Sequence, residues 1–245
     1  MEVLQRVVMI ESRFGRGTAF SLDVDHREYW ITARHVLTGA KGKPFGTTAD
    51  KMVTLKLLSP DASSERWVEV KFAAFFPEAD VDVAVLVPPA NLLPPGVLSS
   101  PKASADGVAI GGACQFLGFP YGGGWIAPTS GGASVWLPYV KRCEIAGMDI
   151  DSRLWILDGI NNPGFSGGPV VYQLGGPTNI AVMAVVSGYR TEPAEVIRGD
   201  ARLLNAPKDT VSLNSGFILA YDIEHALKVI KKHPIGPPRA APSLN

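Results

Sequence analysis

One serine of this chain lies inside a segment of glycines and prolines. Ser166 stands within residues 163–169, Pro-Gly-Phe-Ser-Gly-Gly-Pro, directly before the apolar run 170–172. Glycine allows backbone angles and close approaches that other residues resist, and proline is excluded from helix interiors. A rigid, open loop of this kind presents a hydroxyl nucleophile and leaves nearby N–H groups free to bind an oxyanion. Taken alone, the segment is better explained as a tight turn between two strands.

A histidine and an aspartate lie upstream of this serine in an order that suits nucleophilic catalysis. His35 lies near the end of an aromatic and β-branched run that begins at Tyr29, and Asp82 lies near the start of the apolar run 81–87. The order His35, Asp82, Ser166 matches an arrangement in which the base and its orienting acid come from one β-barrel and the nucleophile from the next. These three residues are therefore the candidates for a catalytic site.

Four short blocks in this order resemble the trypsin/chymotrypsin-like serine peptidases, and most closely their bacterial HtrA-like branch. The blocks are residues 15–20, 32–36, 82–86 and 164–169. They resemble the family's Gly-x-Gly-x-x-Phe hairpin, its Thr-Ala-Ala-His block, its Asp-hydrophobic-Ala-hydrophobic-Leu block and its Gly-Asn/Asp-Ser-Gly-Gly-Pro block. The resemblance extends from about Val7 to the C-terminal helix, and it leaves no room for the PDZ domain that many HtrA proteins carry.

The resemblance implies a role for each candidate and needs neither a metal nor a cofactor. Ser166 is the nucleophile, His35 is the general base and later the general acid, and Asp82 holds the imidazole in its useful tautomer. Asp80 is a second candidate for the acid, but Asp82 fits the family's block better. The backbone N–H groups of Gly164 and Ser166 are expected to form the oxyanion hole.

Substrate contacts follow from the same resemblance. Residues 186–189 resemble the family's Ser-Trp-Gly strand, which pairs with the substrate backbone as an added β-strand. We expect Ser187 to lie near Asp82, and Gly188 and Tyr189 to lie near the P1 pocket.

The base of the P1 pocket is expected about six residues before the nucleophile. This position falls on Ile160 or Gly159, and neither is acidic. A P1 lysine or arginine is therefore disfavoured, and a small or medium apolar P1 residue is expected. Ile160 is equally well explained as an ordinary core residue.

The chain departs from the family pattern around the serine. Phe165 stands where an Asn or Asp is usual, and secreted trypsin-like enzymes use an acid there to capture a new N-terminus after activation cleavage. Its absence argues against such a switch, and we expect Phe165 to contact substrate or to gate the oxyanion loop. The pair Asn161-Asn162 lengthens the approach to the serine. Arg34, beside His35, is expected to be a solvated strand residue.

Other functions remain open beside the serine endopeptidase. Residues 164–168 also match the G-x-S-x-G nucleophile elbow of α/β-hydrolases, but Gly167, Gly168 and Pro169 oppose the helix that this elbow requires. A latent or inactive protease fold that binds peptides is a second interpretation. Activation by a partner protein is a third.

Composition limits the class of protein further. Basic and acidic residues number 23 each, so a nucleic-acid role has little support. No apolar run approaches the about 20 residues that span a membrane, and the first residues contain no signal-peptide core. Cys114 and Cys143 are expected to be buried thiols rather than a disulfide. We therefore expect a cytoplasmic protein that acts on a polypeptide, without nucleic acid or membrane.

The pattern of apolar segments and turns predicts an all-β fold. The 26 glycines and 20 prolines favour many short strands. We expect two six-stranded antiparallel β-barrels packed side by side and a short C-terminal helix over 222–232. The first barrel would comprise residues 1–87, with His35 and Asp82, and a proline-rich crossover residues 88–105. The second barrel and helix would comprise 106–233, with Ser166, and a disordered tail 234–245.

Overall fold

The computed structural model describes residues 2–40, 42–46, 52–59, 66–93, 99–128, 132, 134–176, 179–195 and 210–239. Its first half forms a closed antiparallel barrel with the strand order β1-β2-β3-β6-β5-β4. These strands are β1 (Val7–Ser12), β2 (Gly15–Val24), β3 (Arg27–Thr32), β4 (Met52–Leu58), β5 (Trp67–Phe75) and β6 (Ala84–Val87). The expectation of a six-stranded antiparallel barrel in the first half of the chain is therefore confirmed.

The second half forms a seven-stranded sheet with the order β13-β8-β11-β12-β15-β14-β7. Its strands are β7 (Lys102–Ala103), β8 (Ala113–Gly118), β11 (Tyr139–Asp149), β12 (Leu154–Asp158), β13 (Pro169–Gln173), β14 (Ile180–Glu195) and β15 (Thr210–Asp222). The strand β13 pairs with β8 and also with β14, so the backbone pairings run from β13 around the sheet and back to it. A separate hairpin joins β9 (Trp125–Pro128) and β10 (Ser134–Leu137).

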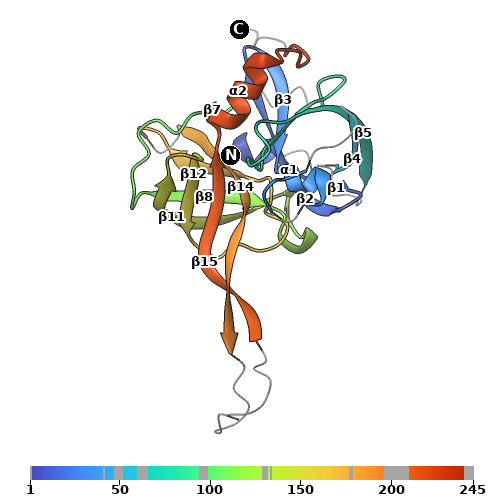
Figure 1. Cartoon of the computed structure of the whole chain (residues 1–245). Helices are drawn as coiled ribbons and strands as arrows, with labels where there is room; N and C mark the ends of the chain where they lie inside the picture. Colours follow the sequence, from blue (N-terminus) through green and yellow to red (C-terminus); the bar gives the residue numbers. More distant parts are fainter. Residues whose placement is uncertain are drawn as a thin grey trace.

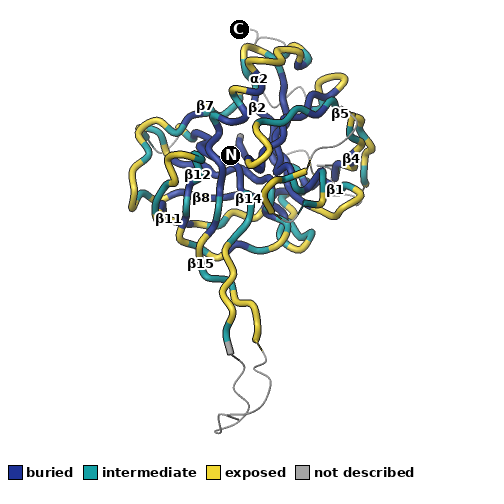
Figure 2. The backbone as a smooth tube through the Cα atoms, viewed as in Figure 1, coloured by how far each residue is buried: buried dark blue, intermediate teal, exposed yellow. Residues whose placement is uncertain are grey.

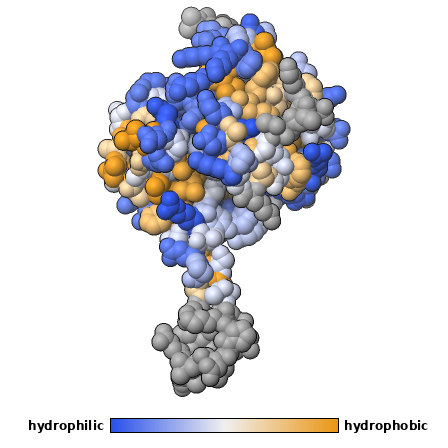
Figure 3. Space-filling model, in the orientation of Figure 1, coloured by the Kyte–Doolittle hydropathy of each residue, from blue (hydrophilic) through white to orange (hydrophobic). Residues whose placement is uncertain are grey.

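The two halves share a core that the C-terminal helix covers. One buried cluster contains Leu22 and Val85 from the first barrel, Val171 from β13, and Val229 and Ile230 from α2 (Glu224–Lys232). Figure 2 shows this interior as a continuous buried region beneath α2. Hydrophilic residues cover the outer face of that helix (Figure 3), as its lysine-rich last turn requires. The predicted helix is confirmed, although it begins at Glu224 rather than at Asp222. No described helix combines the length and apolar character needed to cross a membrane.

The strands β14 and β15 continue together beyond the sheet as a two-stranded arm. Residues 191–195 of β14 pair with 210–214 of β15, and the arm projects away from the rest of the molecule (Figure 1). Residues 210–214 alternate polar and apolar side chains, but the apolar ones, Val211 and Leu213, are exposed. Pairing between the two strands, and not burial of one face, therefore holds this arm together.

The last described residues contradict the expectation of a disordered tail from residue 234. Residues 234–239 lie against β3: Pro238 forms a bridge with Arg27, and the Pro237 carbonyl accepts the N–H of Glu28 at 3.0 Å. The guanidinium of Arg239 lies 3.2 Å from the buried carboxylate of Glu28. Specific polar contacts order this segment although its composition is that of a loop. Residues 240–245 lie outside the described residues.

The two cysteines lie opposite each other on neighbouring strands, Cys114 on β8 and Cys143 on β11. Both are buried free thiols, as predicted, with their sulfur atoms 3.1 Å apart. The hydrogen bond with Cys114 and burial raise the pKa of Cys143.

Candidate active site

Asp82 is fully buried just before β6, and its carboxylate accepts three hydrogen bonds. The backbone N–H of His35 donates to Oδ1 at 2.8 Å, His35 Nδ1 lies 2.6 Å from Oδ2, and Ser187 Oγ donates to Oδ2 at 2.5 Å. Because an ionised carboxylate only accepts, Nδ1 is the donor in this contact, and in the neutral ring Nε2 is then the acceptor. The imidazole is 28% exposed, whereas the carboxylate of Asp82 is fully buried.

His35 lies on the short helix α1 (Arg34–Thr38) rather than at a strand end, because β3 stops at Thr32. Gly39 closes this helix in the left-handed region, with φ of 72°, and its N–H donates to the His35 carbonyl at 2.7 Å. The backbone of His35 is therefore held on both sides, at its amide by Asp82 and at its carbonyl by the Gly39 cap.

Arg34 is buried, so the expectation of a solvated strand residue is wrong. Its guanidinium donates to the carbonyls of Gly46 at 2.6 Å and Glu78 at 2.9 Å, and it lies over the ring of Phe76. Burial lowers the pKa of Arg34, while the nearby negative charge of Asp82 opposes that shift. These contacts tie α1 to the segment that leads into Asp82.

The hydroxyl of Ser166 points toward Ser187 on β14. Ser166 Oγ donates to the Ser187 carbonyl at 3.1 Å, and among the described residues no hydrogen bond joins Ser166 to His35. Ser187 thus contacts Asp82 through its hydroxyl and Ser166 through its carbonyl. Ser187 therefore links Asp82 to Ser166, and Asp82 is bonded in turn to His35 on α1.

The loop that carries Ser166 is held with its carbonyls toward the protein. Thr18 Oγ1 donates to the Gly164 carbonyl at 2.7 Å, and Thr18 N–H donates to the Ser166 carbonyl at 2.9 Å. The N–H of Tyr121 donates to the Pro163 carbonyl at 2.8 Å. In a trans peptide the C=O and N–H point in opposite directions, so the N–H of Gly164 points away from Tyr121.

The N–H groups of Gly164 and Ser166 donate to no acceptor within the described ranges. Gly164 has φ of 109°, and a Cβ atom there would lie 2.3 Å from the Phe119 carbonyl. Only glycine fits this position, because the backbone conformation and the close approach both exclude a side chain. Among the described residues, these two N–H groups near the end of the loop are therefore available to an external acceptor.

Phe165 is fully buried beneath this loop. Its ring packs edge-to-face on Phe116 of β8, with centroids 4.7 Å apart. The expectation that Phe165 contacts substrate or gates the loop does not fit this position. The side chain instead anchors the loop in the core.

The expected substrate residues lie at the edge of the site. Gly188 and Tyr189 follow Ser187 on β14 and pair with Leu219 and Ile218 of β15. Ile160 is 52% exposed, which excludes the alternative of an ordinary core residue, and its carbonyl accepts a hydrogen bond from Lys141 Nζ. Gly159 is held by a hydrogen bond from its N–H to the Gly216 carbonyl, at 2.8 Å.

Three residues that shape this site were missed from the sequence: Thr18, Tyr121 and Lys141. Thr18 lies inside the block 15–20, which marks the hairpin but not the contact across to Gly164. Tyr121 lies in the turn-rich segment 118–124, whose glycines and proline predict a loop but give it no partner. Lys141 has no local sequence signal, because every group that it contacts lies far away in the chain.

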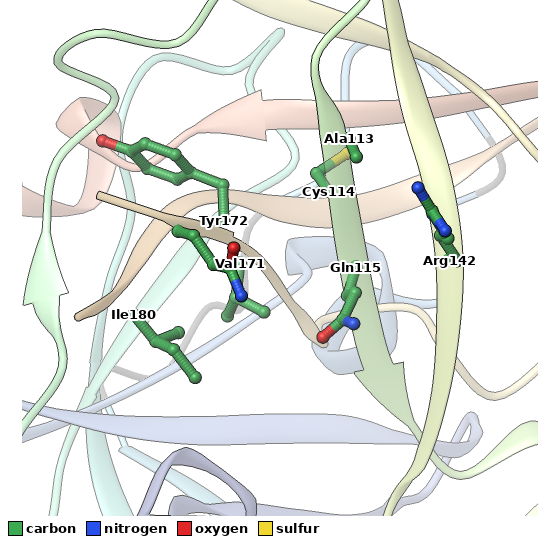
Figure 4. Close-up of a pocket in the computed structure, with 8 residues that line it drawn as sticks. Ala113, Cys114, Gln115, Arg142, Val171, Tyr172 and Ile180 are labelled. Atoms are coloured by element: carbon green, nitrogen blue, oxygen red, sulfur yellow. The ribbon is translucent and has the colours of Figure 1, made fainter. Parts of the chain in front are cut away.

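A cavity of about 430 Å³ lies elsewhere, against strands of the second sheet. Its walls come from β8, β11, β13 and β14 and include Cys114, Arg142 and Tyr172 (Figure 4). Tyr172 is fixed there because its hydroxyl donates to the Asp106 carbonyl at 2.6 Å. The cavity shares no lining residue with the candidate active site.

Comparison with known proteins places this geometry in context. A family model described as a trypsin-like peptidase domain matches residues 17–177. No curated protein matches the sequence.

Solved protease structures share the fold. The inactive form of the protease Rv3671c from M. tuberculosis gives a TM-score of 0.54 at 19% identity, over 94% of this chain and 89% of that one. The HtrA-type protease AlgW with a tripeptide gives 0.54 at 17% identity, over 94% of this chain and 60% of AlgW. The protease Anisep from Arthrobacter nicotinovorans gives 0.55 at 14% identity, over 95% and 96% of the two chains.

Proposed function

This chain belongs to the trypsin-like peptidase family and is a serine endopeptidase, and we propose that His35, Asp82 and Ser166 carry its reaction. The observation that supports this assignment is the shared contact at Ser187, whose hydroxyl reaches Asp82 and whose carbonyl reaches Ser166. The substrates are polypeptides, as the family implies.

The proposed reaction has two halves. Ser166 Oγ rotates from the Ser187 carbonyl toward His35, attacks the peptide carbonyl and gives its proton to Nε2. The oxyanion forms against the N–H groups of Gly164 and Ser166, where the loss of one donor costs about 3–4 kcal/mol of barrier. His35 then protonates the leaving amine, and the C–N bond breaks to leave an ester on Ser166. Water, deprotonated by His35, hydrolyses this ester and restores the serine.

Asp82 keeps His35 in the tautomer that this cycle needs. Its carboxylate holds the proton on Nδ1 and stabilises the imidazolium that forms at each proton transfer. The proposed substrate contacts are the edge of β14 at Ser187, Gly188 and Tyr189, and a P1 pocket beside Ile160. No acidic residue stands at Ile160 or Gly159, which supports an apolar P1 preference.

The same assignment divides the chain into two barrels. We take the ring of pairings that runs from β13 through β8 and back through β14 to be the second barrel, built within 106–233. The first barrel is assigned to 1–87 and the crossover to 88–105. Residues 234–239 are grouped with the first barrel because they pack on β3.

A latent or partner-activated peptidase, or an inactive peptide-binding module, is the second candidate. It is favoured by one observation: Ser166 Oγ is hydrogen-bonded to the Ser187 carbonyl rather than to His35. A peptidase in this state needs a rotation of the serine side chain before it can react.

A fluorophosphonate probe distinguishes these candidates, because it reacts only with a serine that a neighbouring base activates. We expect the wild type to be labelled and the Ser166→Ala and His35→Ala variants to be unlabelled, with peptide cleavage reduced by about 10⁶ in either variant. Mass spectrometry of the labelled peptide locates the adduct. Absence of label on the folded wild type would contradict constitutive catalysis and leave the latent or peptide-binding protein.

A further inference from the structure

Lys141 on β11 reaches the loop that leads into Gly164. Its Nζ donates to the Ile160 carbonyl and, at 3.1 Å, to Oδ1 of Asn162. The same ammonium group lies 5.8 Å from the ring centroid of Phe116 and 6.0 Å from that of Phe165. A cation in this position contacts both the outer surface of the loop and the aromatic pair that anchors the loop in the core.

The described hydrogen bonds of the Lys141 ammonium group all go to the loop. Within the described part of the chain, no Asp or Glu forms an ion pair with it. Partial burial lowers the pKa of Lys141, since desolvation disfavours the ammonium form. A lysine kept half-buried without a carboxylate partner costs stability, and its hydrogen bonds to the loop are what offset that cost.

A chain of hydrogen bonds connects Lys141 to the Pro163–Gly164 peptide, whose N–H is the proposed oxyanion donor. Asn162 accepts from Lys141 through Oδ1 and donates through Nδ2 to the hydroxyl of Tyr121, at 3.3 Å. The backbone N–H of Tyr121 in turn holds the Pro163 carbonyl. Lys141 and Tyr121 therefore both bind the Asn162 side chain. Tyr121 also binds the Pro163 carbonyl, which fixes the plane of the Pro163–Gly164 peptide.

We infer that Lys141 is a positioning residue that keeps the N–H of Gly164 directed at the oxyanion. The inference rests on the proposed function. Phe165 is uncharged, and Lys141 on β11 supplies a charged group that positions this loop. Lys141 does not touch the reacting atoms. It acts through Ile160 and Asn162, so its removal weakens binding of the transition state and leaves binding of an uncleaved peptide unchanged.

The test compares Lys141→Met with Lys141→Arg, with Lys71→Met as the control because Lys71 is an exposed lysine on β5. We expect Lys141→Met to lower kcat by about 10-fold to 100-fold, less than the loss of an oxyanion donor itself, with KM unchanged. Affinity for a peptide aldehyde, whose adduct places an oxyanion in the hole, should fall by a similar factor. Affinity for the same peptide in a Ser166→Ala background should not change. Lys141→Arg should recover part of kcat, because the cation and its donors remain.

A pH profile supplies a second readout. The charged ammonium donates stronger hydrogen bonds to the loop than the neutral amine would, and partial burial lowers the pKa of Lys141 below the ordinary lysine value of about 10.4. Wild-type kcat should therefore fall on the alkaline side, before an ordinary lysine titrates. The Lys141→Arg variant should lack this fall, because guanidinium stays charged.

Amide hydrogen exchange of a peptide covering 160–168 tests the position of the loop without reference to activity. We expect faster exchange in Lys141→Met than in the wild type and in Lys71→Met. Unchanged exchange, or kcat and aldehyde affinity equal to the wild type, would overturn the inference. So would an equal loss of peptide affinity and transition-state affinity, which indicates general destabilisation. A wild type that neither labels nor cleaves, with loop exchange still dependent on Lys141, overturns the proposed function and supports the positioning of the loop.

Discussion

At the residue scale, Thr18 joins parts of the chain that lie far apart in sequence. This buried residue of β2 donates from Oγ1 to the Gly164 carbonyl and accepts the N–H of Phe119 at 3.2 Å. Its backbone N–H holds the Ser166 carbonyl. One threonine of the first barrel thus fixes two carbonyls of the nucleophile loop and one amide of the segment beside it.

Replacing Thr18 by valine keeps the shape of the side chain and removes its hydroxyl. The Gly164 carbonyl and the Phe119 N–H would then be buried without partners, at a cost of about 1–3 kcal/mol for each group. We expect a lower free energy of unfolding in urea and a lower kcat, because the loop that carries Gly164 is released. Thr18→Ser retains the hydroxyl and is the matched control. A valine variant as stable and as active as the serine variant would show that the contact is dispensable.

The candidate catalytic residues could be predicted from the sequence because each lies in a short motif and the motifs follow one another in a characteristic order. The side chains that surround these residues could not be predicted. The roles of Ser187 as a shared contact and of Lys141 on the loop depend on side chains that meet across strands. Arg34 shows the same limit, since its burial follows from the carbonyls of Gly46 and Glu78, which no local pattern reveals.

At the scale of the elements, apolar runs and turn residues were enough to place the strands of the first barrel and most of the second sheet. These patterns did not predict strands that are held by backbone pairing alone and bury no face. Thr191 and Glu192 form strand because they pair with Asn214 and Leu213, in an arm that Figure 2 shows as exposed. Helix α1 was missed because its five residues are too few for a helical period to be seen.

Helix α2 carries a buried histidine that makes its packing sensitive to acid. His225 lies against the ring of Tyr221, and its Nε2 contacts the Ser152 carbonyl at 3.2 Å. Burial lowers the pKa of His225 below its usual value of about 6.5. The unfolded chain therefore binds this proton at a higher pH than the folded chain does.

The sign of the pH dependence follows directly. As pH falls through about 6.5, the unfolded state takes up the proton first, so the free energy of unfolding decreases. We expect His225→Gln, which keeps a donor for the Ser152 carbonyl, to lose less stability than the wild type between about pH 7.5 and about pH 5.5. Urea unfolding at the two pH values measures this difference. The exposed His26, changed to Asn, should leave the wild-type dependence intact, and an identical slope in all three proteins would refute the assignment.

At the scale of the whole molecule, both ends of the described chain meet on the first barrel. Arg6, fully buried near the N-terminus, forms two hydrogen bonds with Asp23. Near the C-terminus, Arg239 lies 3.7 Å from Asp23 and 3.2 Å from the buried carboxylate of Glu28. Glu28 also accepts from Trp30 Nε1 at 2.8 Å. Arg239 thus provides the positive charge that pairs with the buried carboxylate of Glu28 in the barrel wall.

Two truncations test this closure. Ending the chain at His233 removes Arg239 and leaves Glu28 buried without its cation, so we expect a loss of about 3–5 kcal/mol in the free energy of unfolding. Ending it at Arg239 preserves every contact described for the segment and should cost little by comparison. Urea unfolding of both chains gives the comparison. Equal stability of the two truncated proteins would show that residues 234–239 do not support the barrel.

The contact between Arg239 and Glu28 spans 211 residues, and this separation has a consequence for the order of folding. The entropic cost of closing a loop rises with the number of residues in it, so this ion pair is among the contacts least favoured in an unfolded chain. Folding of the strands between the two residues brings the two groups together and removes most of that cost. The ion pair therefore depends on the second half of the chain being folded, and it couples the wall of the first barrel to the sheet that follows it.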